Sequence, residues 1–480
     1  MQNSQLFHVL PLLSSKEYSE LGKFLASPYC NSVERLVEYH EALKKFHPHL
    51  HDMKLTPEEL FKRVFPEGKP FNAGELRGLT SKFHKAVNEF LAFNELKQNE
   101  VLKAKLTTLS LSQKDNYSLF VEKAEAFIKQ LLEKKERDLA HYLDLFEMNR
   151  HLFFHPLTEK RKDGAEFFQQ TVGSLDRFFT LAKLRLAAEH FIRSGDNGVQ
   201  SEIAYLEEAI KQAAIYSEGN PVFGIYLKII QLYQGKGNDQ LFQQLRAEFR
   251  QHGNLLRADE RNEIYPFVMS YAIRQGNQGN KKYQQEQFEI YKDWLQSGLL
   301  IEHNHFPEGI FRQIVSIAIF QGEFDWAEKF MSDYQRFLPP HYREIELNIG
   351  KAEILFYKGK FSECVDFLNQ FKTNNPIVEL WLRRRTIQCL YEDYCANATL
   401  LDALEARIDA FDKYLQRDKI LQKSLVEAHR KFCSLTKKLA NGKNLERREK
   451  LALAKRLKEE LAEPKTIAGR EWLEAKIQAI

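Results

Sequence analysis

The sequence predicts an all-α protein, an irregular right-handed α-solenoid of helical hairpins preceded by an N-terminal helical domain. Apolar residues recur at three- and four-residue spacing through nearly every segment, and the alternating pattern of strands is absent. In addition, one pattern occurs twice, 37 residues apart, in residues 317–331 and 354–368. Each copy has an apolar run, Gly, a charged residue, Phe, and a small residue three positions later. A repeated helix–turn–helix unit is typical of solenoids, in which each repeat packs on its neighbours.

The turn residues explain why each unit breaks into two helices. Glycine tolerates the backbone conformation that ends a helix, and a proline follows the glycine by 17 residues in both copies, at Pro339 and Pro376. Similar turns recur from residue 199 onward at unequal spacing, so we expect irregular repeats. The glycines expected at corresponding turns are Gly235, Gly276, Gly322 and Gly359.

Residues 1–100 predict a small helical domain because capping signals precede each apolar run. Thr56 followed by Pro57 and two acidic residues is a strong helix start, with an N-cap, proline at the first position and negative charge in the first turn. The other expected N-caps are Ser15 for a helix to about Ala26, Asn31 for a helix to about Phe46, and Asn72 for a long helix to about Leu96.

The rest of the chain divides into three predicted segments. Residues 101–198 are expected to form long connecting helices that end in a turn at SGDNG, residues 194–198. Residues 199–430 hold the helical repeats. Residues 431–480 are expected to form a basic helical cap, since a solenoid needs a polar terminal unit.

Composition narrows the class of protein. The 480 residues are 43% apolar, which is ample for a folded core, and the five cysteines are scattered without a CxxC pair. The N-terminal residues lack a basic region followed by a long apolar stretch, and no run approaches 18 apolar residues. We therefore expect a cytoplasmic protein with reduced thiols and no membrane contact.

The two copies resemble the tetratricopeptide repeat over about residues 308–376. The matching positions are Gly322, Phe324, Ala327 and Pro339, and then Gly359, Phe361, Cys364 and Pro376. The small residue lets the paired helices approach closely. The first helices depart from the motif, because Val315 and Ala352 stand where the repeat usually has glycine. The chain also resembles an uncharacterised bacterial protein family, from which no function follows.

The resemblance implies a concave groove lined by the first helix of each hairpin. A groove of mixed aromatic and charged residues suits a protein or peptide partner. Ile349 and Glu353 stand where a terminal-carboxylate clamp would need cations, so that ligand is not expected. The alternative is that groove residues such as Phe356 pack against the next repeat. The residues expected to contact the partner are Arg312, Ser316, Phe320, Glu353, Phe356, Tyr357, Arg383 and Arg384.

A second hypothesis places function in the C-terminal basic segment. Residues 431–460 carry a net charge of +6, whereas the remaining chain carries −2. Such a segment could bind nucleic acid through its phosphates. Its glutamates and leucines are also typical of an ordinary packed helix laced with ion pairs.

No motif indicates catalysis. The sequence lacks the glycine-rich phosphate loops and the nucleophile motif of hydrolases. His151 and His155 share a helical spacing, and His47, His49 and His51 alternate in a loop, but neither set is accompanied by further ligands. We therefore predict a non-catalytic scaffold without cofactor or metal. A sensor with a small ligand in the helical array stays an open alternative.

Overall fold

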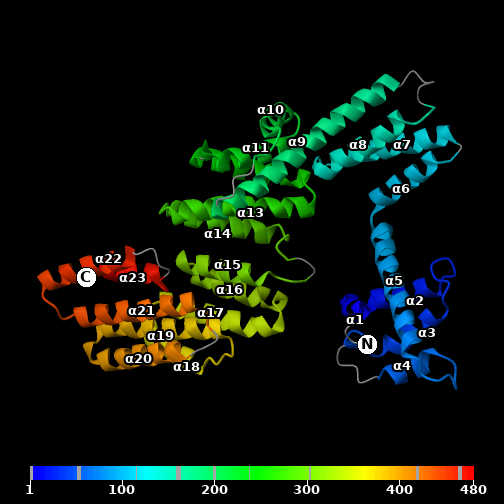
Figure 1. Cartoon of the computed structure of the whole chain (residues 1–480). Coiled ribbons are helices and arrows are strands. Elements are labelled where there is room, and N and C mark those ends of the chain that lie inside the picture. Colours follow the sequence, from blue (N-terminus) through cyan, green and yellow to red (C-terminus); the bar gives the residue numbers. More distant parts are fainter. Residues whose placement is uncertain are drawn as a thin grey trace. The chain divides into compact units, whose positions relative to one another are not determined.

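The computed structural model is built from helices, with no strand in the part of the chain that it describes (Figure 1). It describes residues 4–50, 56–114, 116–157, 164–197, 202–236, 238–301, 304–417, 421–462 and 467–480. The all-α prediction is confirmed. The chain forms two compact units, Met1–Ala182 and Lys183–Ile480, and the boundary falls within helix α9.

The first unit is a succession of helices joined by short turns. They are α1 (Gln5–Val9), η1 (Leu10–Leu12), α2 (Ser15–Ala26), α3 (Arg35–Lys44), α4 (Pro57–Val64), α5 (Ala73–Gln98), α6 (Glu100–Ser112), α7 (Tyr117–Glu133), α8 (Leu139–Phe153) and the start of α9 (Gly164–Asn197). One cluster of buried side chains lies entirely within residues 6–90 and joins α1 to α5. Residues 6–90 therefore share one core.

Capping decides where these helices begin. Thr56 and Glu59 form a reciprocal capping box at the start of α4, and the Asn72 side chain caps α5, as predicted. The cap of α2 is Ser14 rather than Ser15. The prediction for Asn31 is wrong, because its side chain closes the loop after α2 by donating to the Leu25 and Val33 carbonyls.

The second unit is a series of paired helices that follow one another along the chain (Figure 1). After α9 come α10 (Leu206–Tyr216), α11 (Pro221–Gln231), η4 (Leu232–Lys236), α12 (Asp239–His252), η5 (Gly253–Leu255), α13 (Ala258–Asn277), α14 (Lys282–Gln296), α15 (Glu308–Phe320), α16 (Phe324–Tyr334), η6 (Gln335–Phe337), α17 (Pro340–Tyr357), α18 (Phe361–Gln370), α19 (Pro376–Ala396), η7 (Ala398–Leu400), α20 (Leu401–Arg417), α21 (Lys423–Gly442), α22 (Arg447–Ala462) and α23 (Arg470–Gln478).

Two of the predicted turns are shifted. Gly235, Gly322 and Gly359 have positive φ at turns, as expected, but Gly276 lies inside α13 and Gly279 takes the left-handed position instead. A Cβ atom at Gly276 would lie 2.9 Å from Gln287 Nε2 of α14, so this glycine serves close packing. The turn predicted at residues 194–198 is wrong for residues 194–197, because α9 continues through Asn197, and Gly198 lies outside the described residues. A glycine in the interior of a helix lowers its stability by about 1 kcal/mol. A helix of 34 residues tolerates this loss.

Small residues allow the helices of the two clear repeats to approach closely. Ala327 and Cys364, which stand at the small position of the two copies, are fully buried. The interior of α17 also contains Gly350, and a Cβ at this position would clash with the Met331 sulfur on α16. Close packing thus favours glycine at position 350. The motif would place a glycine two residues later, at the position of Ala352.

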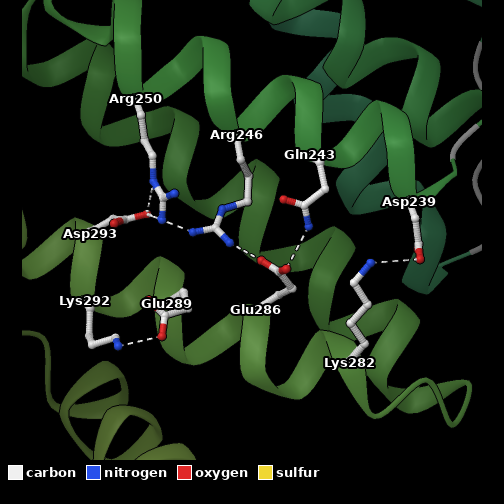
Figure 2. Close-up of polar contacts among 9 residues, drawn as sticks. All are labelled: Asp239, Gln243, Arg246, Arg250, Lys282, Glu286, Glu289, Lys292 and Asp293. Carbon is white, nitrogen blue, oxygen red and sulfur yellow. Dashed lines mark hydrogen bonds and ion pairs between the residues drawn. The ribbon is translucent and has the colours of Figure 1, made fainter.

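Polar side chains connect neighbouring repeats along α12 and α14 (Figure 2). Arg246 of α12 donates to Glu286 and Asp293 of α14, and Arg250 donates to the same Asp293 oxygen. Lys282 pairs with Asp239 at the other end of the row. Because Arg246 is nearly buried and its partners are largely so, this row fixes the register of one helix against the other.

Candidate partner-binding surface

The first helices of the two clear repeats, α15 and α17, pack directly on each other. Phe320 and Tyr357 each stand two residues before the turn glycine of their repeat, so they occupy equivalent positions on adjacent helices. Both are half exposed, at 52% and 49%. Ser316, one turn before Phe320, is also exposed. Three of the predicted contact residues therefore lie on an accessible face, which we call the first-helix surface.

Arg312 belongs to the same stripe of α15, but its charge is neutralised within the protein. Its Nε atom donates to Glu346 Oε2 of α17 at 2.9 Å, and its Nη2 atom donates to the other carboxylate oxygen. Glu346 is buried, whereas the Arg312 side chain is 47% exposed. This hydrogen bond raises the pKa of Arg312. A partner could stack on the guanidinium, but the ion pair leaves no free cation here.

Glu353 and Phe356 are both engaged with Arg385 of the next first helix, α19. Arg385 Nη2 donates to both Glu353 carboxylate oxygens at 2.6 Å. Its guanidinium carbon lies 4.1 Å from the centroid of the Phe356 ring. Phe356 is only 8% exposed and belongs to a core cluster. The packing alternative therefore describes the observed environment of Phe356.

The two arginines of α19 that were predicted to contact the partner, Arg383 and Arg384, differ in their surroundings. Arg383 pairs with Glu379 one turn earlier and lies 4.3 Å over the Tyr414 ring. Arg384 makes no ion pair or hydrogen bond with any described residue, and its Nε atom is buried. Burial, reinforced by the neighbouring Arg385 charge, lowers the pKa of Arg384 to about 10. Its stem packs close to Gly469, just before α23.

Helix α23 covers part of α19 and thus limits the accessible first-helix surface. Trp472 Nε1 donates to Glu392 Oε1 at 2.8 Å, and Lys476 Nζ donates to Glu392 Oε2 at 2.6 Å. The Trp472 ring contacts Tyr391 edge-on. The face that stays open is therefore the part formed by α15 and α17.

Sequence reasoning missed Arg385 and Trp472 as residues that organise this region. Arg385 lies three residues after Leu382 and four before Cys389, and both of these are buried. Helical spacing alone thus indicates that Arg385, rather than its two neighbours, faces the protein interior. No local signal places Trp472, because its partner Glu392 is 80 residues away.

The basic segment 431–460 divides into a packed half and an exposed half. Lys431 and Lys438 both pair with Glu460, and Lys437 pairs with Asp409. In contrast, the exposed cations of α22 form no ion pair with a described residue. These uncommitted cations are Arg447, Arg448, Lys455, Arg456 and Lys458.

Contacts with other side chains or the backbone are present for His47, His151 and His155. His155 stacks on Phe120, and His47 stacks on Tyr18 and contacts the Leu10 carbonyl. His51 lies outside the described residues. Across the described ranges, no group of three or more His, Cys, Asp or Glu residues is arranged to hold a metal ion. None of the helices described combines the length and apolar character that a membrane crossing requires.

Comparison with known proteins gives no relative. No protein-family model matches the sequence, and neither a curated protein nor a solved structure matches it significantly.

Proposed function

We propose that this protein is a non-catalytic interaction scaffold of the cytoplasm that binds a protein or peptide on the first-helix surface. The observation that carries the proposal is the pair of half-exposed aromatic rings at equivalent positions, Phe320 and Tyr357. Aromatic side chains bury a large area at low cost in conformational entropy and dominate binding energy in protein interfaces. The tetratricopeptide-like, right-handed arrangement of the hairpins is part of this proposal.

The charges around these rings favour apolar anchoring over recognition of a charged ligand. Arg312 and Glu353 each have an internal partner, so a peptide would not meet an isolated charge there. Ser316 supplies an exposed hydroxyl beside Phe320 and can position a peptide through a hydrogen bond. Arg383 and Arg384 would contribute at the edge nearest α23.

The test is retrieval of partners from the native cells with the tagged full-length chain after nuclease treatment. A stoichiometric protein should bind the wild type, and Phe320→Ala with Tyr357→Ala should weaken its affinity at least tenfold, because each anchor contributes about 1 to 2 kcal/mol. The matched control is Ile377→Ala, which removes a side chain that is 56% exposed on α19. Equal binding by the double variant, or a melting temperature that falls with the affinity, would contradict the proposal.

The exposed cations of α22 favour a second candidate function, association with nucleic acid. Five exposed Lys and Arg side chains on one helix, none of them paired with a described residue, can neutralise several phosphates. In that case affinity for duplex DNA or RNA would fall steeply with salt, and Arg448→Glu with Lys455→Glu would abolish it. Lys437, which already pairs with Asp409, is the control, since Lys437→Glu should have little effect. Salt-independent binding would rule this candidate out.

A further inference from the structure

A pocket of about 450 Å³ lies among α12, α13 and α14, away from the first-helix surface residues. Its lining combines cations with aromatic rings. The residues that matter are Arg246, Arg250, Arg261, Asp293, Phe249 and Tyr265. Arg246 and Arg250 take part in the polar row between α12 and α14, whereas Arg261 lies outside that row.

Two of the three arginines share one carboxylate of the pocket wall, that of Asp293 (Figure 2). Arg246 Nη2 donates to Asp293 Oδ2 at 2.9 Å and also donates to Glu286. Arg250 Nε donates to the same Asp293 oxygen at 2.8 Å. The Arg250 side chain is 53% exposed, so its guanidinium is within reach of a molecule that enters from solvent.

The third arginine, Arg261, has no such partner. Its guanidinium forms no ion pair or hydrogen bond with a described residue, and its Nε atom is buried. Its Cδ atom would lie 3.5 Å from a Cβ placed on Gly253, so the stem is held against the η5 turn. Two of the three guanidiniums are thus paired with carboxylates, and the third has no anionic partner among the described residues. An anion in the pocket would give the Arg261 guanidinium an acceptor.

We propose that this pocket binds a phosphate monoester group through Arg261 and Arg250. Guanidinium is planar and donates two parallel hydrogen bonds, which matches the oxygens of a phosphate. Phe249 and Tyr265 meet edge-to-face at 5.0 Å and offer an apolar wall for the organic part of the ester. The inference does not depend on the proposed scaffold function, because it uses different helices and residues.

The test is isothermal titration calorimetry of the full-length chain at constant ionic strength, with inorganic phosphate and phenyl phosphate as probes. Both should bind at one site, and phenyl phosphate should bind more tightly because its ring contacts the aromatic wall. Arg261→Met should lower affinity at least tenfold. The control is Arg336→Met, which removes an arginine from the distant η6 turn. Arg250→Met, at a half-exposed position, is a second variant with the same expected loss.

Several results would overturn the proposal. These are no saturable heat with either probe, acetate binding as tightly as phosphate, or affinity unchanged in both arginine variants. A phosphoserine heptapeptide distinguishes the source of the group. Tighter binding of phenyl phosphate than of the peptide assigns the site to a small molecule, whereas the reverse assigns it to a modified protein; both outcomes support a phosphate site.

Discussion

Arg385 of α19 donates to both carboxylate oxygens of Glu353 on α17 at 2.6 Å while its guanidinium lies over the Phe356 ring. The two charged side chains are only 10% and 13% exposed. The contact therefore joins two successive repeats with an ion pair that is almost withdrawn from water. Its two charged members are separated by 32 residues in the sequence.

Replacing Glu353 should expose the cost of burying Arg385. Glu353→Ala leaves a nearly buried guanidinium without its anion, so the free energy of unfolding should fall by about 3 kcal/mol in urea titrations. The control is Glu363→Ala, which breaks an exposed pair with Lys360 and should cost less than about 0.5 kcal/mol. Equal losses in the two variants would show that the Glu353 pair is solvent-screened.

Arg384, the neighbour of Arg385, should behave in the opposite way. Because its guanidinium forms no hydrogen bond or ion pair with a described residue, Arg384→Met removes a desolvated charge and keeps most of the packing. The free energy of unfolding should therefore rise by about 1 kcal/mol. Arg383→Met should instead lower it by about 1 kcal/mol, since it removes the Glu379 pair and the contact with Tyr414. A loss for Arg384→Met would indicate an anion bound at this residue.

Two glycines in first helices should respond oppositely to alanine. Gly350→Ala would force its Cβ into the Met331 side chain, and the resulting repacking should cost about 1 to 3 kcal/mol. A Cβ added at Gly309 would meet open space, so Gly309→Ala should stabilise the protein by up to about 1 kcal/mol. Thermal unfolding monitored by circular dichroism compares the two. If Gly350→Ala is neutral, Met331 is free to move and the close packing is not required.

The first unit should lose stability in mild acid because of His141. Burial, with a smaller contribution from the Arg137 charge, lowers the pKa of His141 to about 4 in the folded protein. The unfolded chain binds this proton below about pH 6.5, whereas the folded chain does not, so stability falls as the pH drops from about 6.5 to about 4. The shift corresponds to about 3 kcal/mol.

The variant His141→Phe isolates this effect. Between pH 7 and pH 4, the free energy of unfolding of this variant should change less than that of the wild type. The difference between the two changes is the contribution of His141. His341, which is exposed, provides the control substitution His341→Phe. If the wild type and His141→Phe show parallel pH profiles, His141 is charged in the folded state.

Local signals in the sequence predicted the helices and several of their ends. The Thr56 and Asn72 caps and the turn glycines Gly322 and Gly359 act within a few residues of themselves, so one sequence suffices to find them. Gly276 was misplaced because the same residue type serves turns and close packing, and only the position of Gln287 on α14 distinguishes the two.

The candidate surface was less predictable because it depends on pairings between repeats. Phe320 and Tyr357 could be predicted to be equivalent from their distance to the turn glycine. Arg312 and Glu353 form ion pairs with residues 34 and 32 positions away in the sequence. No spacing rule predicts contacts over such separations. The phosphate pocket was missed for the same reason, since Arg261 and Arg250 belong to different helices.

The polar contacts between repeats have a consequence for how the second unit forms. Arg246 and Asp293 are 47 residues apart, and Arg312 and Glu346 are 34 apart, so each contact closes as soon as two neighbouring hairpins exist. Short loops of this kind cost little entropy to close, and assembly can start at any hairpin and spread in both directions. The span from Glu392 to Trp472 is longer, at 80 residues. The hydrogen bond between Glu392 and Trp472 must form after the intervening hairpins. Unfolding that begins at the C-terminal end has to break this bond first.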